Sequence, residues 1–282
     1  MENMQQKERQ IPVIYLKPST GWLPLDFSEL WRYRELIFFL TWRDIKVRYK
    51  QAVLGIAWAV LQPLLTMAIF TLIFGVLLET PSQGLPYPLF ALTALLPWQL
   101  FATALQRSSV SLVGNANLIT KIYFPRIAIP LATIFAALID FAVSFVVLLG
   151  VMAYYGVWPG LNILWLPLFV MFTLFTSLAV GLWLSALNVQ YRDVQHMVPF
   201  LVQVWMYASP IVYPIETIPA GWWRSLYSLN PMVGVIQGFR WALLGGVRPD
   251  STMLISIAVV LVLLISGLYY FRRMEKTFAD IV

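Results

Sequence analysis

Residues 55–78 read GIAWAVLQPLLTMAIFTLIFGVLL and contain no charged side chain. A helix needs about 20 largely apolar residues to cross the hydrocarbon core of a membrane, because its backbone polar groups must all be paired internally. This stretch therefore predicts a membrane-spanning helix. Five further stretches resemble it, the fifth in chain order being short, and the six predicted spans are Gly55–Leu78, Tyr87–Leu105, Ile127–Tyr155, Leu161–Leu187, Met197–Val212 and Thr252–Phe271.

The composition agrees with a membrane protein and excludes several classes of site. Of 282 residues 60% are hydrophobic and 11% are charged, whereas a soluble domain carries about a quarter charged residues. Cysteine is absent and His196 is the one histidine, so we expect no disulfide, metal centre or other cofactor in this chain. No phosphate-binding Walker A sequence occurs, and residues 1–54 are too few for a nucleotide-hydrolysing domain. We therefore expect a protein that is not an enzyme and has no catalytic residue.

The positions of Lys and Arg predict the orientation. If both termini are cytoplasmic, every Lys and Arg except Arg224, Arg240 and Arg248 lies on the cytoplasmic side. Residues 213–250 are apolar but interrupted by charged residues and prolines, so no uninterrupted piece is long enough to span. We expect two short helices that enter the outer leaflet and return, in preference to a long aqueous loop. The expected division is a tail with an interfacial helix over 1–54 and a spanning domain over 55–282.

The stretch before the first span, residues 25–55, predicts an amphipathic helix at the membrane surface. It begins near Phe27, and it carries basic residues next to an aromatic face. Most of these charges anchor the helix to anionic lipids. We also expect one or two of Arg43, Arg48 and Lys50, which lie close to the first span, to bind a phosphate-bearing substrate.

Two other features admit a structural and a functional interpretation. The short amphipathic segment Asn115–Tyr123 ends near Pro125 and is either a plain connection or a cytoplasmic helix that docks into a partner protein, which we favour. Asp140 is an acidic residue within a predicted span, with no second charge in a span beside it. We expect it to form a bond between helices, with a role in a pore as the second possibility.

Four stretches together resemble the permease subunits of ABC exporters for surface polysaccharides, of the O-antigen, capsule and teichoic acid type. They are TWRDIKVRYKQAVLGIAWAVLQPLL (41–65), LLPWQLFATALQRSSVSLVGNANLITKIYFPR (95–126), LNVQYRDVQHMVPFLVQVWMYASPIVYPIETIP (187–219) and LNPMVGVIQGFRWALLG (229–245). The resemblance implies an all-α polytopic protein with six transmembrane helices, an N-terminal interfacial amphipathic helix and short re-entrant helices before the last span. It also implies a multi-pass protein of the cytoplasmic membrane.

The resemblance further implies a homodimer joined to two copies of a separate ATPase, which would hold ATP and Mg, and no nucleic-acid partner. The substrate would be a polysaccharide on a polyprenyl diphosphate lipid, with O-antigen as the expected polymer, that passes between the two permeases. The implied roles fall into three groups: Arg43, Arg48, Lys50, Leu54 and Gly55 for the lipid diphosphate, Trp58, Trp98 and Phe101 for the channel lining, and Asn115, Asn117, Lys121 and Tyr123 for coupling to the ATPase.

Three other functions compete with polysaccharide export. An ABC permease for a smaller lipid or drug would share the architecture. An ion-coupled secondary carrier predicts paired charges within the membrane and an internal repeat, neither of which the sequence displays. A membrane-embedded transferase would need acidic and histidine residues on cytoplasmic loops, and these loops are short and poor in them.

Overall fold

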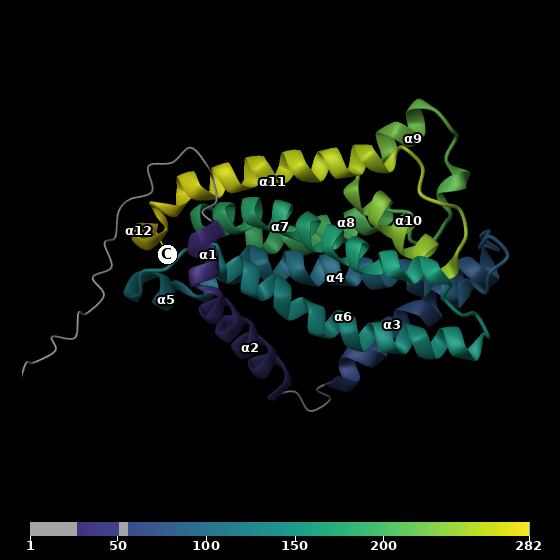
Figure 1. The fold of residues 1–282 in the computed structure, drawn as a ribbon, viewed down its shortest axis with the longest axis horizontal. Coiled ribbons are helices and arrows are strands. Elements are labelled where there is room, and N and C mark those ends of the chain that lie inside the picture. Colours follow the sequence, from purple (N-terminus) through teal and green to yellow (C-terminus); the bar gives the residue numbers. More distant parts are fainter. Residues whose placement is uncertain (1–26, 51–55, 282) are drawn as a thin grey trace, which may run out of the picture.

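The computed structural model describes residues 27–50 and 56–281, and within these ranges it contains helices and no strand (Figure 1). The expected all-α class is therefore confirmed. The predicted boundary between residues 54 and 55, together with Leu54 and Gly55, lies outside the described residues. The helices before the first span are α1 (Phe27–Arg32) and α2 (Arg34–Lys50), and the predicted start near Phe27 stays a prediction because Phe27 is the first described residue.

Five helical stretches are long and apolar enough to cross a membrane, which makes the protein multi-pass. The first is α3 (Ile56–Phe70) with its π-helical continuation (Thr71–Leu77), and it is followed by α4 (Tyr87–Gly114) and α6 (Ala128–Tyr154). The last two are α7 (Leu166–Gln190), which follows a 3-10 turn at Leu161–Trp165, and α11 (Met253–Glu275).

The fifth predicted span, Met197–Val212, corresponds to α8 (Val194–Tyr207), a helix of 14 residues. At about 1.5 Å per residue it is roughly 21 Å long, which is shorter than the roughly 30 Å hydrocarbon core. The chain leaves the helix at Ala208, and Pro210 and Pro214 follow within a few residues. Six spans therefore stay a prediction, because the helix by itself is too short.

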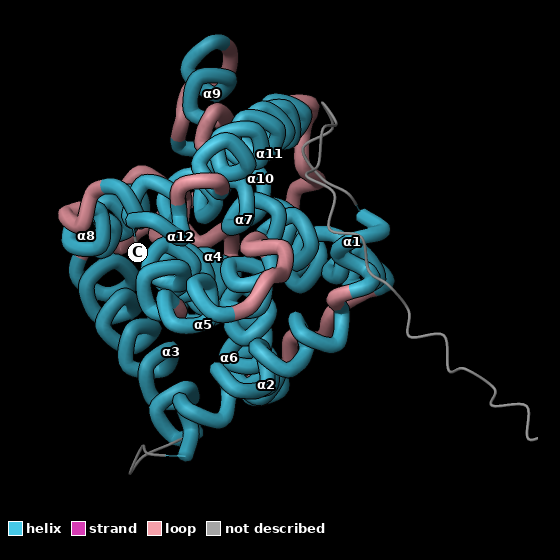
Figure 2. The backbone as a smooth tube through the Cα atoms, turned by 90° about the vertical axis from the view of Figure 1, so that its left-hand side faces the viewer, coloured by secondary structure: helices cyan, strands magenta, loops and turns pink. Residues whose placement is uncertain are grey.

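Helix α4 occupies the centre of the bundle. Figure 2 looks along the bundle from the end that holds α5 (Ala116–Lys121) and α12 (Phe278–Ile281), and α4 lies among the other long helices. Almost all side chains of its first half are buried, as expected for a helix that is apolar on every side. Small residues allow the neighbours to approach closely: a Cβ on Gly181 would collide with the Ser108 hydroxyl of α4, and one on Gly238 with the Phe169 ring.

The segment before α11 forms short helices, as predicted. They are a 3-10 turn (Ile215–Thr217), α9 (Trp222–Tyr227) and α10 (Pro231–Leu244). Asn230 caps α10, since its Oδ1 accepts from the Met232 amide at 3.0 Å. The same oxygen accepts from Trp205 Nε1 of α8 at 2.8 Å. Helix α10 is buried against α4, α7 and α11, so the alternative of an aqueous loop is wrong for it. Its entry into the outer leaflet stays a prediction.

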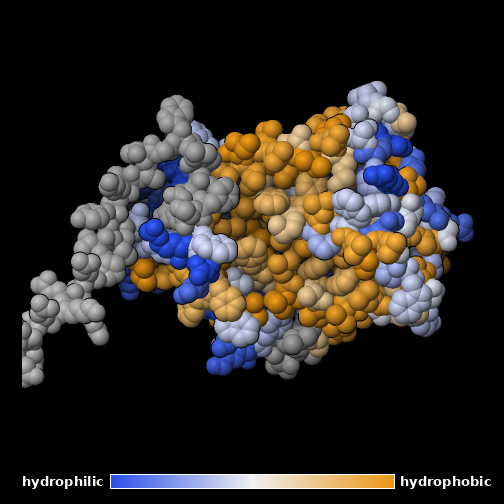
Figure 3. Space-filling view, viewed as in Figure 1, coloured by the Kyte–Doolittle hydropathy of each residue, from blue (hydrophilic) through white to orange (hydrophobic). Residues whose placement is uncertain are grey.

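The surface of the molecule differs between its middle and its two ends. Figure 3 shows a hydrophobic band across the middle of the molecule, with hydrophilic residues gathered toward both ends. One end holds α1, α5 and α12, and the other holds α9 (Figure 1). Helix α2 runs obliquely beside α6, and Thr41 Oγ1 donates to the Ala132 carbonyl at 3.4 Å.

Candidate functional site

The charged residues of three helices meet at Asp140 on α6. Its carboxylate accepts hydrogen bonds from Arg48 Nη1 and from the Tyr49 hydroxyl, both at the end of α2. Arg107 of α4 approaches the same carboxylate, with 3.9 Å between Nη1 and Oδ2. Asp140 does form the expected bond between helices. No second charge lies beside it within a predicted span, yet α2 and the later part of α4 bring two arginines to it from positions far away in the sequence.

A cavity of about 450 Å³ opens beside this cluster, between α2, α3, α4 and α6. Its lining contains both polar and apolar residues. The polar ones are Arg48, Tyr49, Gln62, Gln99, Thr103, Arg107, Asp140 and Ser144, and the apolar ones include Trp58, Leu96, Leu100, Ala137 and Phe141. Two guanidinium groups against one carboxylate leave an excess of positive charge. The cavity can therefore hold a molecule that carries an anionic group next to an apolar or ring-shaped part.

The charged groups of the cavity are partly accessible to solvent. The Arg48 side chain is 18% exposed and the Asp140 side chain 24%. Burial, followed by the hydrogen bond to Asp140, raises the pKa of Tyr49 to about 12. The phenol is therefore protonated at neutral pH and acts as a hydrogen-bond donor to the carboxylate. Since each donor here points at one carboxylate, an incoming anion would compete with Asp140 for the same guanidinium groups.

The predicted diphosphate residues lie in different places. Arg48 lines the cavity, whereas Lys50 is exposed at the end of α2 and is not among the lining residues. Arg43 lies earlier on α2 and is already engaged: its Nη2 donates to Asp44 Oδ1 at 2.9 Å and to Asn115 Oδ1 at 2.8 Å. Of the three predicted basic residues, the structure therefore brings only Arg48 into the cavity.

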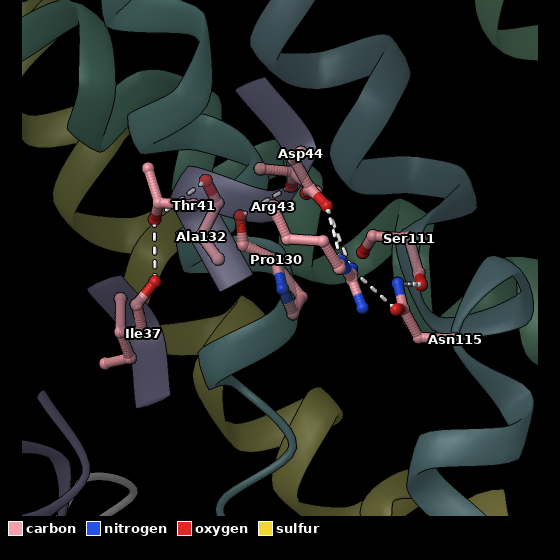
Figure 4. A network of polar contacts seen from close by, with 9 residues as sticks. Ile37, Thr41, Arg43, Asp44, Ser111, Asn115, Pro130 and Ala132 are labelled. Atoms are coloured by element: carbon pink, nitrogen blue, oxygen red, sulfur yellow. Dashed lines mark hydrogen bonds and ion pairs between the residues drawn. The ribbon is translucent and has the colours of Figure 1, made fainter. Parts of the chain in front are cut away.

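The bond between Arg43 and Asn115 joins the interfacial helix to the start of α5 (Figure 4). Asn115 also donates from Nδ2 to the Ser111 carbonyl of α4 at 2.8 Å, so its amide is used at both ends. Its side-chain amide is therefore used within the chain, and the expected role of Asn115 in coupling to the ATPase stays a prediction. The link connects α2, α4 and α5.

The three aromatic residues predicted to line the channel also lie in different places. Trp58 lines the cavity. Trp98 and Phe101 are 3% and 0% exposed, and the Phe101 ring packs edge-on against Trp205 with 4.9 Å between centroids. Both residues pack the core between α4 and α8, so their expected place on a channel surface is corrected. Because α4 lies in the centre of the bundle, its aromatic side chains pack against neighbouring helices.

The remaining predicted residues lie on the exposed side of α5 or just after it. Asn117 and Lys121 are exposed, and Tyr123 is 62% exposed. The opposite side of α5 packs inward through Ile119, which belongs to the same hydrophobic cluster as Phe278 of α12. This short helix therefore offers a polar and aromatic surface at one end of the molecule, and its inner face is held by the core.

Several cavity residues escaped sequence reasoning. Gln62, Gln99 and Thr103 are single polar residues within apolar helices, and Arg107 follows the predicted end of its span. A polar residue within an apolar helix is a signal for such a site. Only the packing of α3 and α4 against α6 reveals which of these polar residues lie near Asp140.

Comparison with known proteins adds a family and several relatives. A model of the ABC-2 type transporter family matches residues 35–244. The chain is 34% identical over 252 residues to the O-antigen export system permease protein RfbA of Myxococcus xanthus, which covers 88% of this chain and 96% of the relative. It is 31% identical to a Klebsiella pneumoniae protein of the same name, over 88% of this chain and 95% of the relative. The polysialic acid transport protein KpsM of Escherichia coli is 28% identical over 83% of this chain and 91% of the relative.

Proposed function

This chain belongs to the ABC-2 type transporter family, and we propose that it is the permease subunit of an ATP-driven exporter for a lipid-linked polysaccharide of the O-antigen class. The observation that carries the proposal is the identity of 34% and 31% to two O-antigen export permeases over nearly their whole length. The relative named for polysialic acid transport supports the same substrate class. A permease for a smaller lipid is the alternative that the experiment below decides.

In this proposal the cavity beside Asp140 receives the diphosphate of the lipid carrier. Arg48 and Arg107 supply guanidinium donors, whose charge-assisted bonds to phosphate oxygens are among the strongest hydrogen bonds in proteins. Asp140 holds both donors in place while the cavity is empty and yields them to the diphosphate when it enters. Trp58 faces the same space and offers a flat apolar surface to the adjoining prenyl unit or sugar ring.

ATP hydrolysis takes place on a partner protein. We place two ATPase copies against a homodimer of this chain, with both termini on the cytoplasmic side of the cytoplasmic membrane. The surface formed by Asn117, Lys121 and Tyr123 contacts the ATPase, because it is exposed and its helix is braced against the core by Ile119. The link from Arg43 to Asn115 then joins the docking helix to α2, whose end carries Arg48.

The test is complementation in a host that lacks its own O-antigen permease, with this chain expressed together with its ATPase. Lipid-linked polysaccharide is then measured inside the cell and at the surface. We expect the intact chain to restore surface polymer, and Arg48→Gln to leave polymer inside. The matched control is Arg34→Gln, an exposed arginine at the start of the same helix, which should export normally. A second experiment depletes this chain from its native host. Unchanged surface polymer after depletion would favour the exporter of a smaller lipid.

A further inference from the structure

A second polar pocket lies at the end of the bundle that carries α9, far from the cavity beside Asp140. It is formed by loop residues 83–85, the segment around Ile215–Thr217, α10 and residues 246–250. Its volume of about 60 Å³ is several times the roughly 10–15 Å³ that one water needs on the same measure, so the pocket has room for a small oxyanion. Three arginines and two acidic residues contribute to its lining, which leaves one positive charge in excess.

Arg240 is the unusual member of this lining. It lies on α10 and is 9% exposed, and its guanidinium is 3.6 Å from the centroid of the Phe90 ring. Nη2 donates to the Ile211 carbonyl at 2.8 Å and Nη1 to the Tyr213 carbonyl at 3.3 Å, whereas Nε has no protein partner. Within the described part of the chain, no carboxylate forms an ion pair with it at 4.0 Å or less. Glu216 acts on this charge only from beyond ion-pair distance, so an anion bound in the pocket would add the direct counter-charge that a buried arginine favours.

The neighbouring side chains have unused polar atoms as well. Arg224 Nε and Gln237 Oε1 are buried without a protein partner. Neither acidic residue pairs with Arg224 Nε: Glu216 accepts from Gln83 Nε2 at 2.8 Å, and Asp250 is 3.8 Å from Arg224 Nη1. Three residues that line the pocket therefore carry unused polar atoms, two donors and one acceptor. An oxyanion whose molecule also carries a hydroxyl group offers the complementary acceptors and donor.

We propose that this pocket binds one oxyanion, a carboxylate or a phosphate, as part of a hydroxylated molecule on the side of the membrane that α9 faces. Arg240 and Arg224 bind the anion, the exposed Arg248 attracts it at the entrance, and Gln237 accepts from its hydroxyl. A uronic acid residue of a polysaccharide and the glycerol phosphate of a lipid headgroup share this chemistry. The proposal concerns binding alone and does not depend on the proposed export function.

The experiment is a thermal unfolding titration of the full chain in nanodiscs of phosphatidylcholine. Sodium glucuronate and sodium glycerol 1-phosphate are the two probes, with glucose and sodium chloride as controls at constant ionic strength. We expect a saturable rise of the unfolding midpoint, roughly 5 °C at a hundredfold excess over Kd, for one or both probes. A rise with glucuronate alone supports an acidic sugar, and a rise with glycerol phosphate alone supports a lipid headgroup. No saturable rise beyond the sodium chloride control for either probe would overturn the proposal.

Variants separate binding from a purely structural role of Arg240, which also ties the loop at 211–213 to α10. Arg240→Gln could fail to fold, so Arg248→Gln and Arg224→Gln carry the test. Each should raise Kd about tenfold or more without lowering the midpoint measured in the absence of probe by a comparable amount. Arg273→Gln, an exposed arginine near the opposite end, is the matched control and should bind as the unaltered chain does. Equal Kd values in all of these variants would refute the assignment.

Discussion

The ion pair between Arg48 and Asp140 should contribute measurably to the folding of this protein. Its side chains are 18% and 24% exposed, which lies between a surface pair, worth about 0–1 kcal/mol, and a fully buried pair, whose disruption costs about 3–5 kcal/mol. We expect Arg48→Met or Asp140→Asn alone to lower the free energy of unfolding by about 2 kcal/mol. The double variant should lose less than the sum of the two, with a coupling energy of about 1–2 kcal/mol.

The assay is reversible unfolding in mixed micelles, with helicity measured as the fraction of denaturing detergent rises. A matched cycle uses Arg43→Met and Asp44→Asn, a pair of adjacent residues whose side chains are 36% and 21% exposed. That pair should couple by less than about 0.5 kcal/mol, because Arg43 keeps its bond to Asn115 when the carboxylate is removed.

Additive losses in the first cycle, within about 0.5 kcal/mol, would refute the reasoning. They would mean that Arg48 and Asp140 contribute separately, for instance through Arg107 and Tyr49, and that the carboxylate does not hold the arginine in place. The same result would remove the argument that an incoming anion must displace Asp140 from its partner.

Three further predictions concern packing and coupling. Gly238→Ala should lower the free energy of unfolding by about 1–3 kcal/mol in the same assay, because the new methyl group meets the Phe169 ring; an unchanged midpoint would contradict this packing. Lys121→Glu should weaken co-purification with the ATPase while leaving the yield of the permease unchanged, and normal co-purification would argue against this docking surface. Asn115→Ala should leave ATPase binding intact but lower export per ATP hydrolysed, as should Arg43→Met; full coupling in both would show that their link is only structural.

Much of the architecture follows from residue patterns that act locally. Runs of apolar residues predicted five helices that the structure contains, and the short helices α9 and α10 were expected from prolines and charges that interrupt an apolar segment. Arg48 was singled out because it lies close to the first span, and Trp58 through the resemblance to polysaccharide-export permeases; both line the cavity beside Asp140. Such features concern backbone pairing and hydrophobicity, which depend on neighbours in sequence.

Local residue patterns are enough to establish a multi-pass helical membrane protein and the helix that carries the basic residues. Which of those residues meet depends on how the helices pack. Arg48, Arg107 and Asp140 come together from three helices, while Arg43 turns to Asn115, and Trp98 and Phe101 are enclosed in the core. The physical reason is that helix formation is set by local hydrogen bonds, whereas the side that each helix buries depends on how α4 packs among its neighbours.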